Sequence, residues 1–196
     1  MKTTIAAVLI MMAGLTASAQ TNLVQNGGFE QGNLKTLSKE GQTPFEWYFN
    51  LNTSRLPGAK LSYSTSVFYE GKKSVKMNVS ACEVQKRYDM LLLQNLGVIK
   101  NTKLTLTFYV KSNNALKLAG FLSGTETESG KSLTGRGASI SVDGSNKWKK
   151  YSVQLDRRPY GDGHFDLSKD MFINVVLDKQ VLESDVEFYI DQIELL

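Results

Sequence analysis

The chain has 196 residues, 41% of them hydrophobic, a formal net charge of +4 and a single cysteine. This length is enough for one domain with a hydrophobic core, and the lone Cys82 excludes an intrachain disulfide. The basic residues are scattered rather than gathered in a stripe, so we expect no nucleic-acid partner.

The N-terminus has the pattern of a secretory signal peptide. Lys2 precedes an apolar run from Ile5 to Leu15, and small residues follow up to Ala19. The run is too short to span a bilayer core of about 30 Å, although an N-terminal membrane anchor is the alternative interpretation. No cysteine lies near the cleavage point for lipid attachment. We therefore expect removal of residues 1–19, one domain over 20–196, and a secreted or periplasmic protein without membrane insertion.

The stretch NLVQNGGFEQGN, residues 22–33, opens the part of the chain that is expected to fold. Its glycines permit a turn, Phe29 is a candidate core anchor, and Glu30 places a carboxylate beside it. We predict an edge strand followed by a turn.

Most later segments alternate apolar and polar residues, which is typical of half-buried β-strands. Gly, Asn, Asp, Ser and Pro separate these segments, and none sustains a helical repeat. Many short strands with frequent turns predict an all-β fold, a β-sandwich or jelly roll. The predicted strands are 72–80, 90–98, 104–112, 150–155, 172–178 and 186–195.

Six pieces of the chain follow one another in a characteristic order: NLVQNGGFEQG, Trp47, VFYEGKKSVKMNV, LLLQNLGVIKNTKLTLTFYVKS, KWKKYSVQL and FYIDQIELL. In this order they resemble the carbohydrate-binding modules of families four, nine and twenty-two. The resemblance implies a galactose-binding-like jelly roll over nearly all of residues 20–196. It also implies a protein that binds a polysaccharide or oligosaccharide without catalysis, with separately encoded glycan-degrading enzymes as candidate partners.

The resemblance further implies a structural calcium ion, because the family patterns NGxFE, GxxS and YIDxI all occur in this chain. It assigns side-chain carboxylates to Glu30 and Asp191 and a backbone carbonyl to the turn around Lys73. Calcium prefers several hard oxygen ligands, and a carboxylate within an otherwise apolar strand is costly to bury alone. The alternative is that both are solvated edge carboxylates, or that one pairs with Lys72 or Lys73.

Sugar rings are bound by exposed aromatic planes with polar groups around them. Tyr109 lies on the polar face of strand 104–112, which meets solvent or a concave groove in a sandwich. It is our best candidate for stacking, and an ordinary exposed cross-strand tyrosine is the alternative. Asn174 and Gln94 are expected to line the same sheet. Arg87 and Tyr88, just before strand 90–98, are weaker candidates.

Trp47 and Tyr48 are further candidates, from the stretch FEWYFN. The strand period places Trp47 with Phe49 on one face and Tyr48 on the other, so we expect one of these faces to be exposed. Packing in the core is the preferred interpretation of Trp47 itself, because large aromatic side chains are usually buried.

The loop DRRPYGDGHFD, residues 156–166, supplies the last candidates. Tyr160 could stack on a sugar and Arg158 could bond hydroxyls or an acidic sugar, since loops often carry binding residues. The alternative is a solvated loop without a function.

The residues do not single out a catalytic site. No pair of carboxylates forms a pattern that indicates a glycoside hydrolase. A polysaccharide lyase uses arginine with tyrosine or histidine, and Arg157, Tyr160 and His164 are of these types, but they share one loop. The remaining alternative is a protein-interaction, adhesion or structural jelly roll that binds no glycan.

Overall fold

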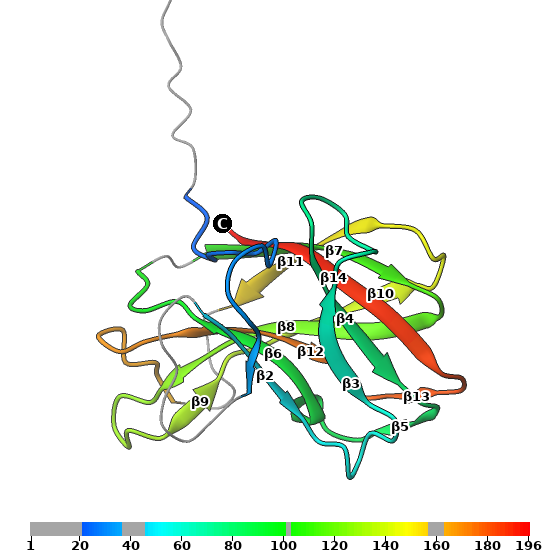
Figure 1. Ribbon diagram of the computed structural model, residues 1–196. Helices are drawn as coiled ribbons and strands as arrows, with labels where there is room; N and C mark the ends of the chain where they lie inside the picture. The colour runs from blue at the N-terminus through cyan, green and yellow to red at the C-terminus, as the bar shows by residue number, and fades with distance from the viewer. Residues whose placement is uncertain (1–20, 37–45, 101–102, 157–162) are drawn as a thin grey trace, which may run out of the picture.

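The computed structural model describes residues 21–36, 46–100, 103–156 and 163–196. Within these ranges two largely antiparallel sheets pack face to face, and a short two-stranded ribbon lies beside them (Figure 1). The described part of the chain has one 3-10 turn, η1 (Arg87–Asp89), and none of its helices is long and apolar enough to span a membrane. The predicted signal peptide, residues 1–19, lies outside the described residues.

The larger sheet has seven strands in the order β1-β2-β6-β12-β8-β10, with β9 also paired to β8. All of its pairs are antiparallel except β1 with β2. Its strand β6 is buried along its whole length, which fits the apolar run 90–93, and the polar Gln94 and Asn95 that complete the strand are buried as well. The strands are β1 (Lys35–Thr36), β2 (Trp47–Leu51), β6 (Met90–Asn95), β8 (Ala115–Thr125), β9 (Ser132–Thr134), β10 (Ala138–Asp143) and β12 (Phe172–Leu177).

The smaller sheet has five strands in the order β11-β7-β14-β4-β3. The chain passes repeatedly between the sheets, as from β6 to β7 to β8, which is the connectivity of a jelly roll. The predicted all-β sandwich is confirmed. The strands are β3 (Lys60–Ser64), β4 (Ser74–Val79), β7 (Lys103–Ser112), β11 (Lys149–Asp156) and β14 (Val186–Leu195), and the ribbon pairs β5 (Cys82–Val84) with β13 (Gln180–Leu182).

The core lies between the two sheets and follows the predicted alternation. The apolar face of β7, from Leu104 through Leu106 and Phe108 to Val110, is almost completely buried. The sheets approach each other closely at Gly120 of β8, where an added Cβ would lie 2.4 Å from Leu106 Cδ2. A glycine is therefore needed there to let the two layers meet.

The N-terminal segment differs from the prediction, because residues 22–33 form no strand. The segment instead follows β14 through two backbone bonds, Leu23 N to Leu195 O at 2.9 Å and Ile193 N to Gly27 O at 3.0 Å. The left-handed backbone at Asn26 and Phe29 (φ 50° and 60°) bends the chain out of strand geometry. The bend turns Phe29 fully into the core, as predicted.

Candidate ligand-binding site

A second hydrophobic cluster lies on the outer face of the seven-stranded sheet, away from the main core. We call it the outer-sheet cluster. Strand register places Tyr48, Leu93, Asn174 and Phe121 in one row across β2, β6, β12 and β8. Apolar residues on both faces of a strand indicate a sheet that is covered on both sides. The cluster consists of Tyr48, Leu91, Leu93, Ala119, Phe121 and Val176, with Phe172 packed against it.

Asn174 is buried within this face. Its Nδ2 donates to Ser123 Oγ at 2.9 Å, to Phe172 O at 3.2 Å and to Phe121 O at 3.3 Å. These bonds satisfy the amide inside the protein, because a buried polar group without a partner is costly. Asn174 therefore orders the face rather than presenting a free donor from it.

The outer-sheet cluster borders a pocket of about 400 Å³ at Phe121, which we call the Tyr88 pocket. The ring of Tyr88 is 47% exposed and meets the ring of Phe121 edge to face, with centroids 5.8 Å apart. The Tyr88 hydroxyl lies 2.7 Å from Thr134 Oγ1. The backbone carbonyl of Tyr88 accepts a hydrogen bond from Asn50 Nδ2 at 2.8 Å. An exposed aromatic ring is thus held at both ends. The pocket is lined by Lys86, Arg87, Tyr88, Phe121, Thr134 and Lys179.

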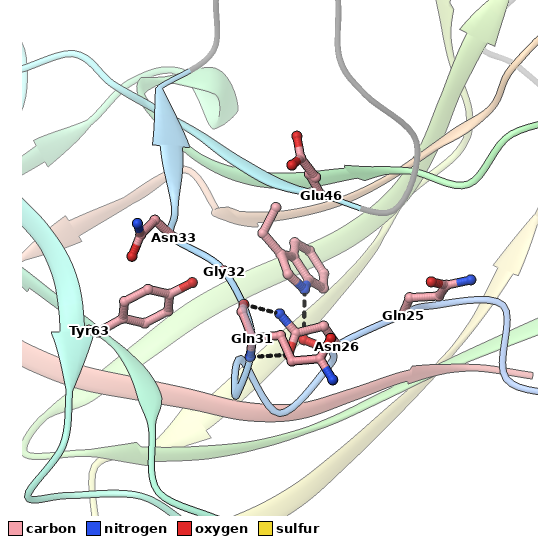
Figure 2. Close-up of a pocket in the computed structure, with 8 residues that line it drawn as sticks. Gln25, Asn26, Gln31, Gly32, Asn33, Glu46 and Tyr63 are labelled. Carbon is pink, nitrogen blue, oxygen red and sulfur yellow. Dashed lines mark hydrogen bonds between the residues drawn. The ribbon is translucent and has the colours of Figure 1, made fainter.

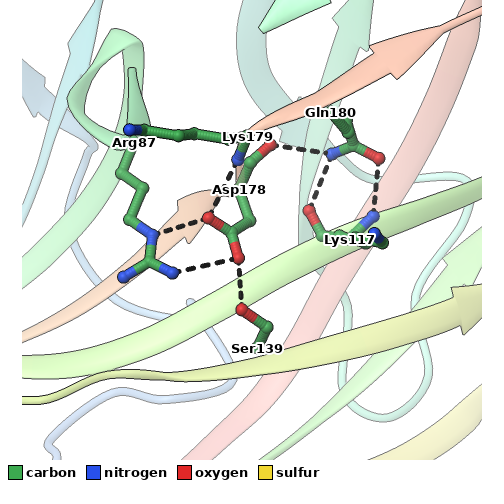
Figure 3. Close-up of polar contacts among 6 residues, drawn as sticks. All are labelled: Arg87, Lys117, Ser139, Asp178, Lys179 and Gln180. Atoms are coloured by element: carbon green, nitrogen blue, oxygen red, sulfur yellow. Dashed lines mark hydrogen bonds and ion pairs between the residues drawn. The ribbon is translucent and has the colours of Figure 1, made fainter. Parts of the chain in front are cut away.

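Arg87 is fixed at the pocket by the buried carboxylate of Asp178 (Figure 3). Arg87 Nε donates to Asp178 Oδ1 at 2.6 Å and Nη2 donates to Oδ2 at 3.3 Å. Ser139 Oγ and the backbone N–H of Lys179 also donate to this carboxylate. Burial alone would raise the pKa of Asp178, but these donors, Arg87 first, outweigh it and hold the pKa below its usual value.

Tyr109 lies on the other sheet, so the expectation that Asn174 and Gln94 share its sheet is wrong. Tyr109 is on the outer face of the five-stranded sheet, where the ring of Tyr69 stacks on it with centroids 3.7 Å apart. Trp148 meets Tyr69 edge to face at 6.0 Å. We call this group the five-stranded-sheet aromatics. Gln94 faces the core, because it accepts a bond from Gln25 N and donates to Gln25 O.

Trp47 and Tyr48 are both buried, which contradicts the expectation that one face of this strand is exposed. Trp47 packs on Phe29 in the core and its Nε1 donates to Asn26 O at 3.0 Å. Tyr48 packs in the outer-sheet cluster. Both sides of β2 are covered because each sheet face carries its own apolar layer.

A separate polar pocket of about 520 Å³ lies where Trp47 of β2 comes near Tyr63 of β3 (Figure 2). Asn26 closes the turn beneath it, accepting from Gln31 N at 2.9 Å and donating to Gln31 O at 2.6 Å. The buried Trp47 offers no stacking plane here. The lining residues are Gln25, Asn26, Gln31, Gly32, Asn33, Glu46, Trp47 and Tyr63.

The predicted metal ligands Glu30 and Asp191 converge on one loop, between β3 and β4. Glu30 Oε1 accepts the backbone N–H groups of Lys72 at 2.7 Å and Lys73 at 2.9 Å, and Asp191 Oδ2 accepts that of Tyr69 at 2.8 Å. Asp191 is fully buried. Its burial raises its pKa above the usual value, the backbone donors act against this, and the Glu30 charge raises it further.

Sequence reasoning missed most of the Tyr88 pocket. Lys86 directly precedes η1 and Tyr88 lies within it, whereas Thr134 belongs to β9 and Lys179 follows β12. No linear pattern links these segments, and the adjacent Arg87 and Tyr88 are the one sequence signal that pointed there. The candidates Arg158 and Tyr160 lie outside the described residues, so they stay predictions.

The fold is shared with solved structures of carbohydrate-binding modules, at identities that establish the fold alone. A candidate sugar-binding protein from Bacteroides thetaiotaomicron VPI-5482 has a TM-score of 0.69 and 16% identity, over 89% of this chain and 99% of that one. The CBM22-1 xylan-binding domain of Paenibacillus barcinonensis Xyn10C has a TM-score of 0.53 and 16% identity, and the match covers 89% of this chain and 93% of that one. TmCBM61, solved with β-1,4-galactotriose, has a TM-score of 0.51 and 15% identity, and the match covers 90% of this chain and 99% of that one. No family model and no curated protein matches the sequence.

Proposed function

We propose that this chain is an exported, non-catalytic carbohydrate-binding module whose ligand occupies the Tyr88 pocket. The observation that carries the proposal is the exposed Tyr88 ring, held over Phe121 and tied to Thr134. A sugar ring has an apolar face that fits an aromatic plane and hydroxyls that fit the surrounding polar groups. The pocket volume of about 400 Å³ suits a short stretch of glycan. The shared fold supports this assignment as an analogy.

The proposal excludes catalysis by the Tyr88 pocket. The described residues that line the pocket are three basic side chains, an aromatic pair and a threonine, with no carboxylate among them. Glycoside hydrolysis typically uses two carboxylates across the scissile bond, which this lining does not supply. Arg87 and Tyr88 are of residue types that a polysaccharide lyase uses, but Asp178 already holds the Arg87 guanidinium, so we assign binding without turnover to this pocket.

A structural calcium ion, held by Glu30 and Asp191, forms part of the proposal. The donor set fits: both carboxylates face the loop that carries Lys73, and Asp191 is buried without a described cationic side chain beside it. The described residues contain no group of three or more His, Cys, Asp or Glu side chains, so carbonyl oxygens such as that of Lys73 would complete the sphere. The ion would supply positive charge to two carboxylates near the chain's ends.

Native affinity electrophoresis of the purified protein through gels containing neutral and acidic polysaccharides tests the proposal. We expect retardation by at least one glycan and no release of product. The Tyr88→Ala variant should lose about 1–3 kcal/mol of binding free energy, the scale of a buried aromatic contact.

Tyr109→Ala is the matched control, since it also removes one tyrosine ring and lies on the opposite sheet. It should be retarded like the wild type. If Tyr109→Ala loses retardation and Tyr88→Ala keeps it, the ligand binds at the five-stranded-sheet aromatics instead. Absence of retardation by every glycan would favour a protein-interaction or structural role.

A further inference from the structure

The charge of the Tyr88 pocket is unusual for a site that binds neutral sugars. Among the described residues, its lining contains Lys86, Arg87 and Lys179 and no acidic residue. Lys86 and Lys179 are exposed, and neither forms an ion pair with a carboxylate of the described residues. The pocket therefore presents positive charge to whatever occupies it.

The nearby Asp178 does not neutralise the two lysines. It is 5% exposed, and both of its oxygens are taken by Arg87, with Ser139 Oγ and Lys179 N as further donors (Figure 3). A carboxylate saturated in this way positions Arg87 and compensates its charge. Lys86 and Lys179 thus line the pocket as exposed residues whose charge Asp178 does not compensate.

The polar pocket of Figure 2 provides the internal contrast. The described part of its lining has amide side chains and the carboxylate of Glu46, but no lysine or arginine. The two pockets are similar in volume, at about 520 and 400 Å³. The net charge of +4 on the chain therefore does not by itself explain the basic lining of the Tyr88 pocket, because the other pocket of the same chain lacks it.

Resting on the carbohydrate site proposed above, we propose that the Tyr88 pocket selects an anionic glycan, one whose sugar carries a carboxylate or a sulfate group. The sugar ring lies against Tyr88, and its anionic group lies between Lys86 and Lys179. Ammonium groups attract such anions, and a pocket wall of low dielectric strengthens the attraction.

The experiment compares matched glycan pairs in affinity gels and by titration calorimetry. One pair is polygalacturonate and its methyl-esterified form, and the other is a sulfated galactan and its desulfated form. We expect the charged member of at least one pair to bind about tenfold more tightly, as two partly exposed ion pairs allow. Raising the salt concentration should reduce this preference. The pair that shows it identifies carboxylate or sulfate as the recognised group.

The Lys86→Gln/Lys179→Gln double variant should lose the preference, so that it binds the charged and the uncharged member of a pair with equal affinity. The control is Lys60→Gln/Lys147→Gln, which removes the same charge from exposed lysines outside the pocket, and it should keep the preference.

The outcomes separate this inference from the proposed function. Equal binding of charged and uncharged members by the wild type, or a preference that survives in the pocket double variant, overturns the anionic selectivity while the carbohydrate site stands. Failure of every glycan to bind overturns both. A preference lost equally in the two double variants shows a general charge effect and also overturns the inference.

Discussion

The outer faces of the two sheets differ in what covers them. The seven-stranded sheet carries the buried outer-sheet cluster, in which the ring of Phe121 is 1% exposed. The five-stranded sheet carries the five-stranded-sheet aromatics, where the outermost ring, Tyr69, is 42% exposed, and lysines lie beside the rings. An aromatic side chain on an outward face can therefore be a packing group on one sheet and a surface group on the other.

This difference indicates which exposed aromatic ring is preorganised for ligand binding. Tyr69 and Tyr109 already stack on each other, so the inner ring has one face occupied by the protein itself. Tyr88 is fixed by its edge contact with Phe121 and by Thr134, which leaves a ring beside a pocket. A preorganised ring next to a cavity favours ligand binding more than a ring within a surface stack.

The largest expected difference between the faces concerns stability. Leu93→Ala removes a buried side chain from the outer-sheet cluster and should cost about 2–5 kcal/mol of unfolding free energy. Tyr109→Ala removes a half-buried ring from the opposite face and should cost less than half as much. Urea denaturation followed by fluorescence measures both. Equal costs would contradict the conclusion that Leu93 belongs to a buried layer whereas Tyr109 belongs to a surface stack.

Calcium is expected to act on the five-stranded side alone, through the loop that carries Tyr69. Addition of the ion at about 100 times its Kd should raise the unfolding free energy by about 2.7 kcal/mol, and a chelator should reverse this. Asp191→Ala should abolish the response, whereas Asp178→Asn should keep it. A melting temperature that is insensitive to calcium and chelator in the wild type would exclude the ion.

The ion pair of the seven-stranded side should be intermediate in its effect. Asp178→Asn should cost about 1.5–3 kcal/mol near neutral pH, because it weakens charge-assisted hydrogen bonds to a buried group. The folded pKa of Asp178 lies below its usual value, so the ionised form stabilises the fold above about pH 4. This contribution is lost as the pH falls through the folded pKa. The difference between variant and wild type should therefore shrink in denaturation curves measured at successively lower pH.

The smallest effect is expected for the ion pair on the five-stranded face. Lys76 Nζ lies 2.5 Å from Glu187 Oε2, and this hydrogen bond is the main reason why the pKa of Glu187 is lowered to about 2. Both side chains are about a third exposed, so solvent screens the pair. Glu187→Gln should cost less than about 1 kcal/mol, and a cost equal to that of Asp178→Asn would contradict the distinction.

Much of the fold could be predicted from the sequence, because alternation in a strand is a local property. The spacing of Leu104, Leu106 and Phe108 predicts both the strand and its buried face, and β7 has both. The six segments that resemble carbohydrate-binding modules predict the sandwich. They also predict that Glu30 and Asp191 lie near each other, and in the structure both carboxylates contact the loop between β3 and β4. The stretch 22–33 was mispredicted, because a left-handed residue such as Asn26 cannot be read from composition.

The sequence by itself determined six of the strands, their inward faces and the class of the fold, since these follow from side-chain periodicity and turn residues. Only the tertiary structure decided which outward face is covered, because alternation shows that a residue points outward and not what lies above it. It placed Tyr109 and Asn174 on different sheets. It also brought Phe121, Thr134 and Lys179 to Tyr88 from three distant segments, a proximity that arises from strand pairing and crossover rather than from spacing along the chain.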